Sequence, residues 1–477
     1  MPWADVAQGY ALLALRHKSP ENIVALSAHA GRLSLQPSAN RHKLSAFRHV
    51  LKGTQRVPNR PFGDLIDRVA RARSDHRERH RPTGFGFALA DSVDYLDAAQ
   101  WDGLTASQSR FLQRPYLRVL EQFGPSNVRQ RYALVFRGRQ PVAALAAQLA
   151  TITADTLVKD DSPAAARSAK PSLQEVMDPI ARKVRGRALG QVRADVLICG
   201  NLFSWGLHGA AFAKGEDSSA LWPAVAEAVY RLRRAERLAS RVDFTIVKDV
   251  PDPDADGSRA LERFSYQPFD TDPDMVLDLA PEWRTYDDYL SGLNAKYRKA
   301  AVRTLKEVEQ AGYTLEQMTD LEAHAARLHE LYRQVHERAT LRLVMLPAGF
   351  FPALAAALPG QFRCGAIRRG DELAGFVTTL KDKDTAVGYY LGYDTAANAS
   401  VPIYLRLLHA VVADALALGC RRLSLGRTAL EPKARLGARP EPLRIWLRHR
   451  QPVFNWLVRP LLGLVPVDEV PERNPFK

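Results

Sequence analysis

The sequence has little that would support disulfide or metal-based stabilisation. Its 477 residues include only three cysteines, Cys199, Cys364 and Cys420, and none belongs to a CxxC pair or a Cys/His cluster. This spacing predicts neither a disulfide framework nor a zinc site, and the apolar neighbours of each cysteine predict buried, inert thiols. We therefore expect catalysis, if any, without a metal.

Long apolar runs and several common catalytic motifs are also absent. No apolar stretch reaches the roughly 18 residues that a membrane-spanning helix needs, because even 401–418 is interrupted by polar residues. The N-terminus lacks the basic-then-apolar order of a signal peptide, so we expect a cytoplasmic protein. The chain has no GxSxG, no Walker A loop and no GxGxxG after a strand, which argues against three large enzyme classes.

The composition is that of a globular protein with a basic surplus. Apolar residues make up 46% and charged residues 25%, and the length allows two or three domains. The formal net charge is +15, and residues 1–80 hold 14 Lys and Arg against 6 Asp and Glu. Such a surplus favours an anionic partner, namely a phosphate-rich cofactor, nucleic acid or an anionic membrane surface. A solvated basic tail is the alternative.

The same order of predicted elements occurs twice, which is the main clue to the fold. In each copy two strands joined by an Arg-Gly turn are followed by a third strand, a helix and a fourth strand. In the first copy these elements are expected at 131–136, 141–149, 195–201, 220–239 and 241–247. In the second copy they are expected at 363–369, 373–380, 385–393, 401–418 and 421–426. This order predicts an α/β fold with mixed sheets flanked by helices.

Composition shifts suggest five segments. The stretch 36–62 is rich in Pro, Ser, Asn and Arg, the insertion at 154–194 is polar, and 249–273 is dense in Asp and Pro. We expect a basic, partly disordered extension, a first domain, a linker, a second domain and a tail, at 1–80, 81–250, 251–273, 274–450 and 451–477 respectively. In the tail, the apolar segment 452–465 either packs on the second domain or lies on a membrane surface.

The junction between the strand at 385–393 and the helix at 401–418 is a candidate site. Ser400 is a favourable N-cap, and Pro402 fits the first helical turn. The free N–H groups of this helix would face the end of the strand and suit a pyrophosphate or carboxylate. A strand that parts from its neighbour there can also pair with an amide-bearing ligand. An ordinary strand-to-helix junction is the alternative.

The next segment adds fixed positive charge. A strand ends in Gly426-Arg427-Thr428, and Lys433, Arg435 and Arg439 come soon after. Cations at the end of a strand suit an anionic substrate.

Three stretches resemble one family of enzymes. They are YDDYLSGLNAKYRKAAVR (286–303), VLICGNLFSWGLHG (196–209) and the run from YYLGYDTAANAS to KARLGA (389–438). They resemble GNAT-fold acyltransferases of the FemAB-like (BioF2-like) group. The resemblance covers about residues 85–450 and implies two GNAT-like domains in tandem. It also implies transfer of an acyl or aminoacyl group from acyl-CoA, acyl carrier protein or aminoacyl-tRNA to an amine.

The chain departs from the family at one point. GNAT enzymes place a Gly-rich loop led by Arg or Gln before the helix, whereas here the loop is 394–400, with an Asp and no Gly. The identity of the donor therefore stays open. Besides an acyl-CoA N-acyltransferase, we consider a tRNA-dependent peptidyltransferase on a cell-wall precursor. A non-catalytic protein that binds nucleic acid or a membrane surface is the third reading.

Individual residues are assigned on this basis. For catalysis we predict Tyr390 as a proton donor, Asp394 as a base, and Lys433 as the group that holds an oxyanion or carboxylate, with Tyr404 beside the junction. Core packing, a turn and a solvated surface are the respective structural alternatives. We assign cofactor binding to Gly392, Ser400, Ile403, Arg427 and Thr428. We assign substrate binding to Tyr289, Lys296, Arg298 and Lys299 on a basic helix expected at 285–310. Secondary candidates are His208 as a base in the first domain, and Glu337 and Arg338 along the cleft.

Overall fold

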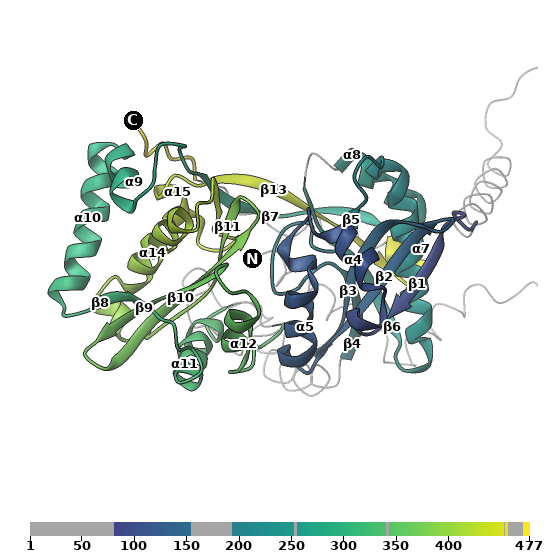
Figure 1. Cartoon of the computed structure of the whole chain (residues 1–477), viewed down its shortest axis with the longest axis horizontal. Helices are drawn as coiled ribbons and strands as arrows, with labels where there is room; N and C mark the ends of the chain where they lie inside the picture. The colour runs from purple at the N-terminus through teal and green to yellow at the C-terminus, as the bar shows by residue number, and fades with distance from the viewer. Residues whose placement is uncertain (1–80, 154–192, 252–254, 340–342, 453, 457–470) are drawn as a thin grey trace, which may run out of the picture. The chain divides into compact units, whose positions relative to one another are not determined.

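The computed structural model of the chain describes residues 81–153, 193–251, 255–339, 343–452, 454–456 and 471–477 (Figure 1). Predictions for 1–80, for most of the insertion at 154–194 and for most of 452–465 lie outside these residues. The strands are β1 (Gly86–Ala90), β2 (Val128–Arg137), β3 (Gln140–Thr153), β4 (Arg193–Cys199), β5 (Ala210–Phe212), β6 (Val242–Pro251), β7 (Gln267–Asp278), β8 (Thr314–Gln317), β9 (Phe362–Arg369), β10 (Glu372–Asp382), β11 (Thr385–Tyr393), β12 (Arg422–Ser424) and β13 (Arg439–His449).

The helices alternate with these strands. The α-helices are α4 (Ala98–Thr105), α5 (Arg114–Phe123), α7 (Ser218–Ala235), α8 (Ala255–Ser258), α9 (Tyr286–Gly292), α10 (Ala295–Gln310), α11 (Ala325–His336), α12 (Phe350–Ala357), α13 (Ala397–Ser400), α14 (Ile403–Ala417) and α15 (Leu430–Arg435). The 3-10 turns are η3 (Val93–Tyr95), η4 (Arg110–Leu112), η7 (Glu236–Leu238) and η9 (Arg259–Phe264).

Both predicted strand sets form, and they pair in the same way. β2 and β3 are antiparallel around a turn with Gly138 at φ 63°, and β9 and β10 are antiparallel around a turn with Gly370 at φ 58°. Glycine adopts these left-handed angles without steric cost, which explains the Arg-Gly signal in the sequence. In each set the third strand is parallel to the fourth across a helix, β4 with β6 and β11 with β12. The predicted α/β fold with mixed strands is thereby confirmed.

The strands at the centre of the sheet cross between the two sets. We call residues 81–250 the first half and residues 274–450 the second half. Among the described residues the sheet runs β1-β2-β3-β4-β6-β13-β7-β12-β11-β10-β9-β8. β13, from the end of the second half, therefore lies between β6 and β7 and is antiparallel to both. In Figure 1 these two long strands, β7 and β13, span the distance between the halves.

This crossing corrects the predicted linker at 251–273. η9 and the first residues of β7 occupy much of that segment, because β7 begins at Gln267 and not after the Asp/Pro-rich stretch. Pro268 and Pro273 are the source of the error, since proline is rare in strands that are paired on both sides. β7 tolerates them where its pairing with β13 is irregular and before its pairing with β12 begins.

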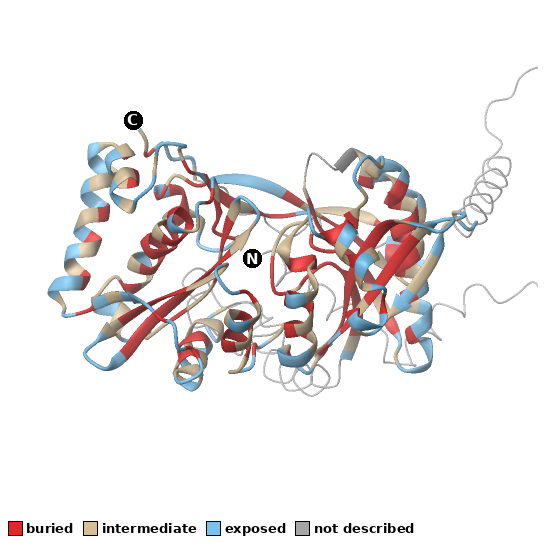
Figure 2. Ribbon diagram, in the orientation of Figure 1, coloured by how far each residue is buried: buried red, intermediate tan, exposed pale blue. Residues whose placement is uncertain are grey.

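The predicted basic helix at 285–310 is two helices. Thr285 caps α9 as expected and forms a reciprocal capping box with Asp288. The chain then bends at Leu293, which forms a β-bridge with Phe476 near the C-terminus, and Asn294 caps α10. α14 packs on β9, β10 and β11, and α10 packs on α14. Burial follows this layering, since the sheet-facing side of α14 is buried while much of α10 is exposed (Figure 2).

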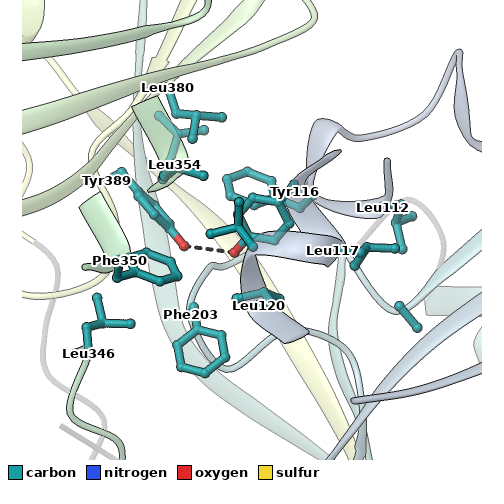
Figure 3. Packing of buried hydrophobic residues seen from close by; sticks show 14 of the residues in the cluster. Leu112, Tyr116, Leu117, Leu120, Phe203, Leu346, Phe350, Leu354, Leu380 and Tyr389 are labelled. Atoms are coloured by element: carbon teal, nitrogen blue, oxygen red, sulfur yellow. Dashed lines mark hydrogen bonds between the residues drawn. The ribbon is translucent and has the colours of Figure 1, made fainter. Parts of the chain in front are cut away.

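A buried cluster joins the halves on the opposite face. It includes α5 and the 200–209 loop from the first half, together with α11, α12 and β11 from the second. Tyr116 on α5 and Tyr389 on β11 lie in it, and their hydroxyl oxygens share a hydrogen bond of 2.8 Å (Figure 3). Burial of large side chains such as Phe203, Phe350 and Tyr116 holds the halves together through the hydrophobic effect. The three cysteines are buried and unpaired, as predicted.

Candidate functional site

Two parallel strands part in the second half, and the opening defines the candidate site. β11 pairs with β12 from Thr385 to Val387, and the pairing ends at Ser424, while β11 continues to Tyr393. Where parallel strands separate, backbone groups become available for an extended ligand. The sequence predicted a ligand site at this end of β11.

A loop from the first half lies beside the opening. We call residues 200–209 the bridging loop. Trp205 donates its indole N–H to Ser424 Oγ, and Tyr390 Oη donates to the backbone oxygen of Phe203 at 3.4 Å. Gly426 has φ 78°, where other residues are strained, and a Cβ there would make a tight contact of 3.1 Å with the Trp205 ring. The first half therefore forms one wall of the site in the second half.

Buried polar side chains hold the bridging loop in place. Gln148 Oε1 accepts from Leu202 N at 2.7 Å, and Asn201 Oδ1 accepts from Phe203 N at 2.8 Å. Asn201 Nδ2 also donates to Tyr116 Oη at 2.9 Å, and Tyr116 in turn bonds Tyr389 on β11. A buried, connected network of this kind fixes a single arrangement, because leaving any member unpaired is costly.

The carboxylate of Asp274 lies where β12 ends. Asp274 on β7 accepts hydrogen bonds from Ser424 Oγ at 2.6 Å and from Gly426 N at 2.9 Å. Burial raises the pKa of Asp274 above its usual value, although these bonds, Arg427 and Lys433 oppose the shift. A carboxylate with a raised pKa is a stronger proton acceptor than an ordinary one.

Lys433 on α15 is the predicted catalytic residue whose charge acts on this carboxylate. Its side chain is 4% exposed, and burial lowers the pKa of Lys433 to about 8, with Asp274 acting against the shift. Within the part of the chain that the structure describes, its Nζ makes no hydrogen bond or ion pair. The prediction of a solvated surface lysine, the structural alternative, is therefore wrong.

A buried ion-pair group joins the first half to Arg427. Lys248 Nζ bonds Asp249 Oδ2 and donates to Ser204 O at 2.8 Å, and Arg427 Nη2 pairs with Asp249 Oδ1. Asp249 is fully buried and has φ 59°. Burial would raise the pKa of Asp249, but Arg427 and Lys248 outweigh it and hold the pKa below the usual value. Thr428, the next predicted residue, is exposed.

N–H groups of the predicted anion site at 394–404 are bonded by side chains of the loop itself and by Gln334 on α11. Asp394 Oδ1 accepts from Ala396 N at 2.9 Å and from Ala397 N at 3.0 Å, and Gln334 Oε1 accepts from Thr395 N at 3.0 Å. Asn398 Oδ1 accepts from Tyr404 N at 2.8 Å. Since these N–H groups have partners, the loop does not fit the pyrophosphate of coenzyme A.

Ser400 does not cap α14, contrary to the sequence prediction. It closes the short helix α13 and donates to Ala397 O at 3.2 Å, and the capping oxygen comes from Asn398 instead. The side chain of Asn398, two residues before Ser400, reaches the start of α14 because α13 turns the chain back. The sequence does not predict α13, because a helix of four residues is too short to show a periodic pattern of apolar residues.

Two other residues assigned to cofactor binding are core positions. A Cβ at Gly392 would lie 2.4 Å from the backbone nitrogen of Tyr332, so this glycine is needed for close packing of α11 on β11. Ile403 is fully buried at the start of α14. The predicted contacts of both residues with a cofactor do not fit these positions.

The predicted substrate-binding residues lie on α9 and α10, apart from the opening. Lys296 and Lys299 are exposed and Arg298 is half-buried. Tyr289 is 0% exposed, and its hydroxyl donates to Leu436 O at 3.0 Å, so a substrate contact does not fit its position. The two lysines remain a candidate surface for an anionic partner.

A cavity of about 620 Å³ lies elsewhere between the halves. Glu337, a predicted cleft residue, lines it with His336, Asn127 and Met345 among others. The Tyr332 hydroxyl lies 3.3 Å from His336 Nδ1, and the Tyr332 ring lies 5.7 Å from the Tyr390 ring. Aromatic side chains thus separate the cavity from the opening at β11.

Because His208 in the bridging loop is buried, we expect the stability of the protein to depend on pH in the acidic range. Its Nδ1 bonds Ser204 Oγ at 2.6 Å, and Asp382 and Lys383 face it from the second half. Burial, with Lys248 and Lys383, lowers the pKa of His208 to about 3, although Asp249 opposes the shift. The unfolded chain therefore binds a proton below about pH 6.5 that the folded chain does not.

Stability should consequently fall as the pH falls through about 6.5. Between pH 7.5 and pH 5.5, His208 should lower the free energy of unfolding by about 1.4 kcal/mol. A His208→Asn variant should not show this contribution. Urea unfolding of both proteins at the two pH values measures the difference. Equal pH dependence in the two proteins would show that the imidazole is hydrated in the folded state.

Several residues of the site were not predicted individually. They are Asn201, Trp205, Lys248, Asp249, Asp274 and Ser424. A usable signal existed for Lys248 and Asp249, which are charged residues directly after the apolar strand predicted at 241–247. No signal indicated that Trp205 would reach β12.

The described residues contain neither a metal-ligand group nor a membrane span. No group of three or more His, Cys, Asp or Glu side chains there is placed to hold a metal ion. In the same part of the chain, no helix has both the length and the apolar character for crossing a membrane.

Comparison with known proteins locates the family similarity in the second half. Residues 295–434 match the family described as "Acetyltransferase (GNAT) domain". This match confirms the predicted GNAT-like fold, and the paired strand sets show the same topology in the first half. No curated protein matches the chain.

The solved structures that match the chain are distant in sequence. One, "Crystal structure of FemX", is 10% identical, with 78% of this chain and 100% of that chain covered and a TM-score of 0.45. A tandem GNAT protein from the clavulanic acid biosynthesis pathway is 13% identical, with 77% and 99% covered and a TM-score of 0.43. L-PGS from Bacillus licheniformis is 11% identical, with 72% and 95% covered and a TM-score of 0.40.

Proposed function

We propose that the protein transfers an acyl or aminoacyl group from an activated donor to an amine. The GNAT domain match supports acyl transfer in general. The observation that carries the proposal is the opening between β11 and β12, with Asp274 and Lys433 at its edge. A reactive carbonyl held along β11 would be next to a carboxylate with a raised pKa.

The reaction follows from these groups. The amine nitrogen attacks the donor carbonyl, and Asp274 accepts the proton that the amine loses. The new C–N bond forms as the C–S or C–O bond to the carrier breaks, and Asp274 returns the proton to the leaving group. Backbone N–H groups of β11 beyond Val387 hold the oxyanion, and positioning of the two reactants supplies much of the rate.

We propose only the chemical class of the acyl or aminoacyl donor. GNAT domains in general use acyl-CoA, but the satisfied N–H groups at 394–404 argue against a pyrophosphate bound there. An acyl carrier protein or an aminoacyl-tRNA would not need that contact. The exposed Lys296 and Lys299 on α10 favour such a macromolecular, anionic donor.

A donor panel tests the proposal. Acetyl-CoA, a long-chain acyl-CoA, an acylated carrier protein and aminoacyl-tRNA are each incubated with the protein and mixed amines, and amide products are identified by mass spectrometry. We expect an amide from one donor class only. No amide from any donor, together with salt-sensitive binding of RNA or anionic vesicles, would favour a non-catalytic binding protein.

A further inference from the structure

Five charged side chains meet where the halves join, and we call them the seam cluster. They are Lys248, Asp249, Asp274, Arg427 and Lys433. Arg427 and Lys433 both act on Asp274, while Arg427 and Lys248 both act on Asp249. The Asp249 pairs are direct ion pairs, whereas Arg427 and Lys433 act on Asp274 from beyond ion-pair distance, so the two carboxylates and three cations form one electrostatically linked group.

Two donors in this cluster are unused. Lys433 is 4% exposed and its Nζ has no hydrogen bond or ion pair among the described residues, although this nitrogen is not one of the fully buried atoms that lack a partner. Arg427 Nε is buried and likewise without a hydrogen-bond partner there. Buried donors nearly always have partners, so the unused Arg427 Nε indicates a water, an ion or a ligand group.

The charges of the cluster do not balance. Three cations face two carboxylates, and near pH 7 both lysines stay mostly protonated, since burial lowers the pKa of each only to about 8. A buried surplus of one positive charge is costly without an anion beside it. Asp249 is also held at φ 59°, a backbone conformation that persists where the surroundings enforce it and that is common at ligand sites.

We propose that the seam cluster binds the carboxylate group of the amine acceptor, through Lys433 and Arg427. This inference rests on the proposed function. One carboxylate neutralises the surplus, whereas a doubly charged phosphate would reverse it, and the planar guanidinium suits a carboxylate. The side chain of Arg427 is 13% exposed, so the cluster reaches solvent on that side.

The position of Asp274 indicates what binding of the acceptor carboxylate would achieve. Asp274 interacts with both cations and is the proton acceptor in the proposed reaction. A carboxylate held by Arg427 and Lys433 would bring the amine of the same small molecule next to this base. The acceptor would then be an amino acid or a short peptide and not a simple amine.

Matched acceptor pairs test the inference. Amino acids and dipeptides are compared with their C-terminal amides, first by the melting temperature of the full-length protein and then as acyl acceptors. We expect the free acids to raise the melting temperature and to be acylated at least about tenfold more efficiently than the amides. O-phosphoethanolamine serves as the phosphate-bearing probe.

Variants on α15 locate the effect. Lys433→Met should abolish the preference for free acids, and Lys433→Arg, which retains the positive charge, should keep most of it. Arg435→Met is the matched control, because this exposed residue pairs with Glu431 on the same helix and should change nothing.

The outcomes separate this inference from the proposed function. Equal use of acids and amides, or no melting shift with any free acid, would overturn the carboxylate site. A stronger response to O-phosphoethanolamine would assign the site to phosphate instead. A melting shift that depends on Lys433, with no amide product from any donor, would leave the carboxylate site standing and remove the proposed function.

Discussion

Replacement of Asp274 by Asn should lower acyl transfer by about 100- to 10,000-fold, the usual contribution of a general base. The amide keeps the size of the carboxylate; its oxygen can still accept from Gly426 N, and its NH2 group can donate to Ser424 Oγ, so the fold should be retained. The variant loses the proton acceptor together with one negative charge of the seam cluster. Initial rates of amide formation with the active donor, at saturating acceptor, measure the effect.

The matched control is Asp270→Asn on the same strand. Asp270 is exposed and pairs with Arg444, so its replacement should leave the rate within about twofold, because exposed ion pairs contribute little. The pH profile gives a second check. Because the pKa of Asp274 is raised, wild-type kcat/KM should decline as the pH falls towards that pKa, and the residual activity of the variant should not. Unchanged activity in Asp274→Asn would mean that another group, or water, removes the proton.

The second large effect concerns stability. Asp249→Asn should lower the free energy of unfolding by about 3–5 kcal/mol, the usual cost of removing one partner of a buried ion pair. Lys248 and Arg427 would then lose their direct ion-pair partner, and Arg427 would keep only the longer-range attraction of Asp274. Asn tolerates the left-handed backbone at φ 59° about as well as Asp, so the change isolates the charge.

Urea unfolding at pH 7 measures this loss. Asp243→Asn, on the same strand β6, removes a partly exposed carboxylate that pairs with Arg241 and Arg450, and should cost about 1 kcal/mol or less. Adding Lys248→Met to Asp249→Asn should recover part of the stability, since one unpaired buried cation is removed. A loss below about 1 kcal/mol for Asp249→Asn would show that water reaches these charges.

Local signals predicted the repeated strand pairs. The Arg-Gly turns, the alternation of apolar residues and the apolar face of α14 depend on neighbours a few residues away, and each was found close to its predicted place. Boundaries moved by a few residues. The strand expected at 421–426 pairs only from Arg422 to Ser424, because β12 leaves β11 early.

Long-range pairing could not be predicted in the same way. β13 carries two prolines and separates β6 from β7, and its place depends on partners nearly two hundred positions away in the chain. The burial of Lys433 has the same origin. Its sequence neighbours include exposed residues such as Arg435, and it is the pairing of β7 with β12 that sets Asp274 close to it.

The sequence by itself determined the class of fold, the place where β11 ends and the presence of cations soon after β12, since all three depend on local residue patterns. Only the tertiary structure decided which of those cations are buried, which loop forms the wall of the opening and which carboxylates face Arg427 and Lys433. The reason is physical: a pKa depends on desolvation and on charges within a few ångströms, and here both are set by chain segments that are distant in the sequence.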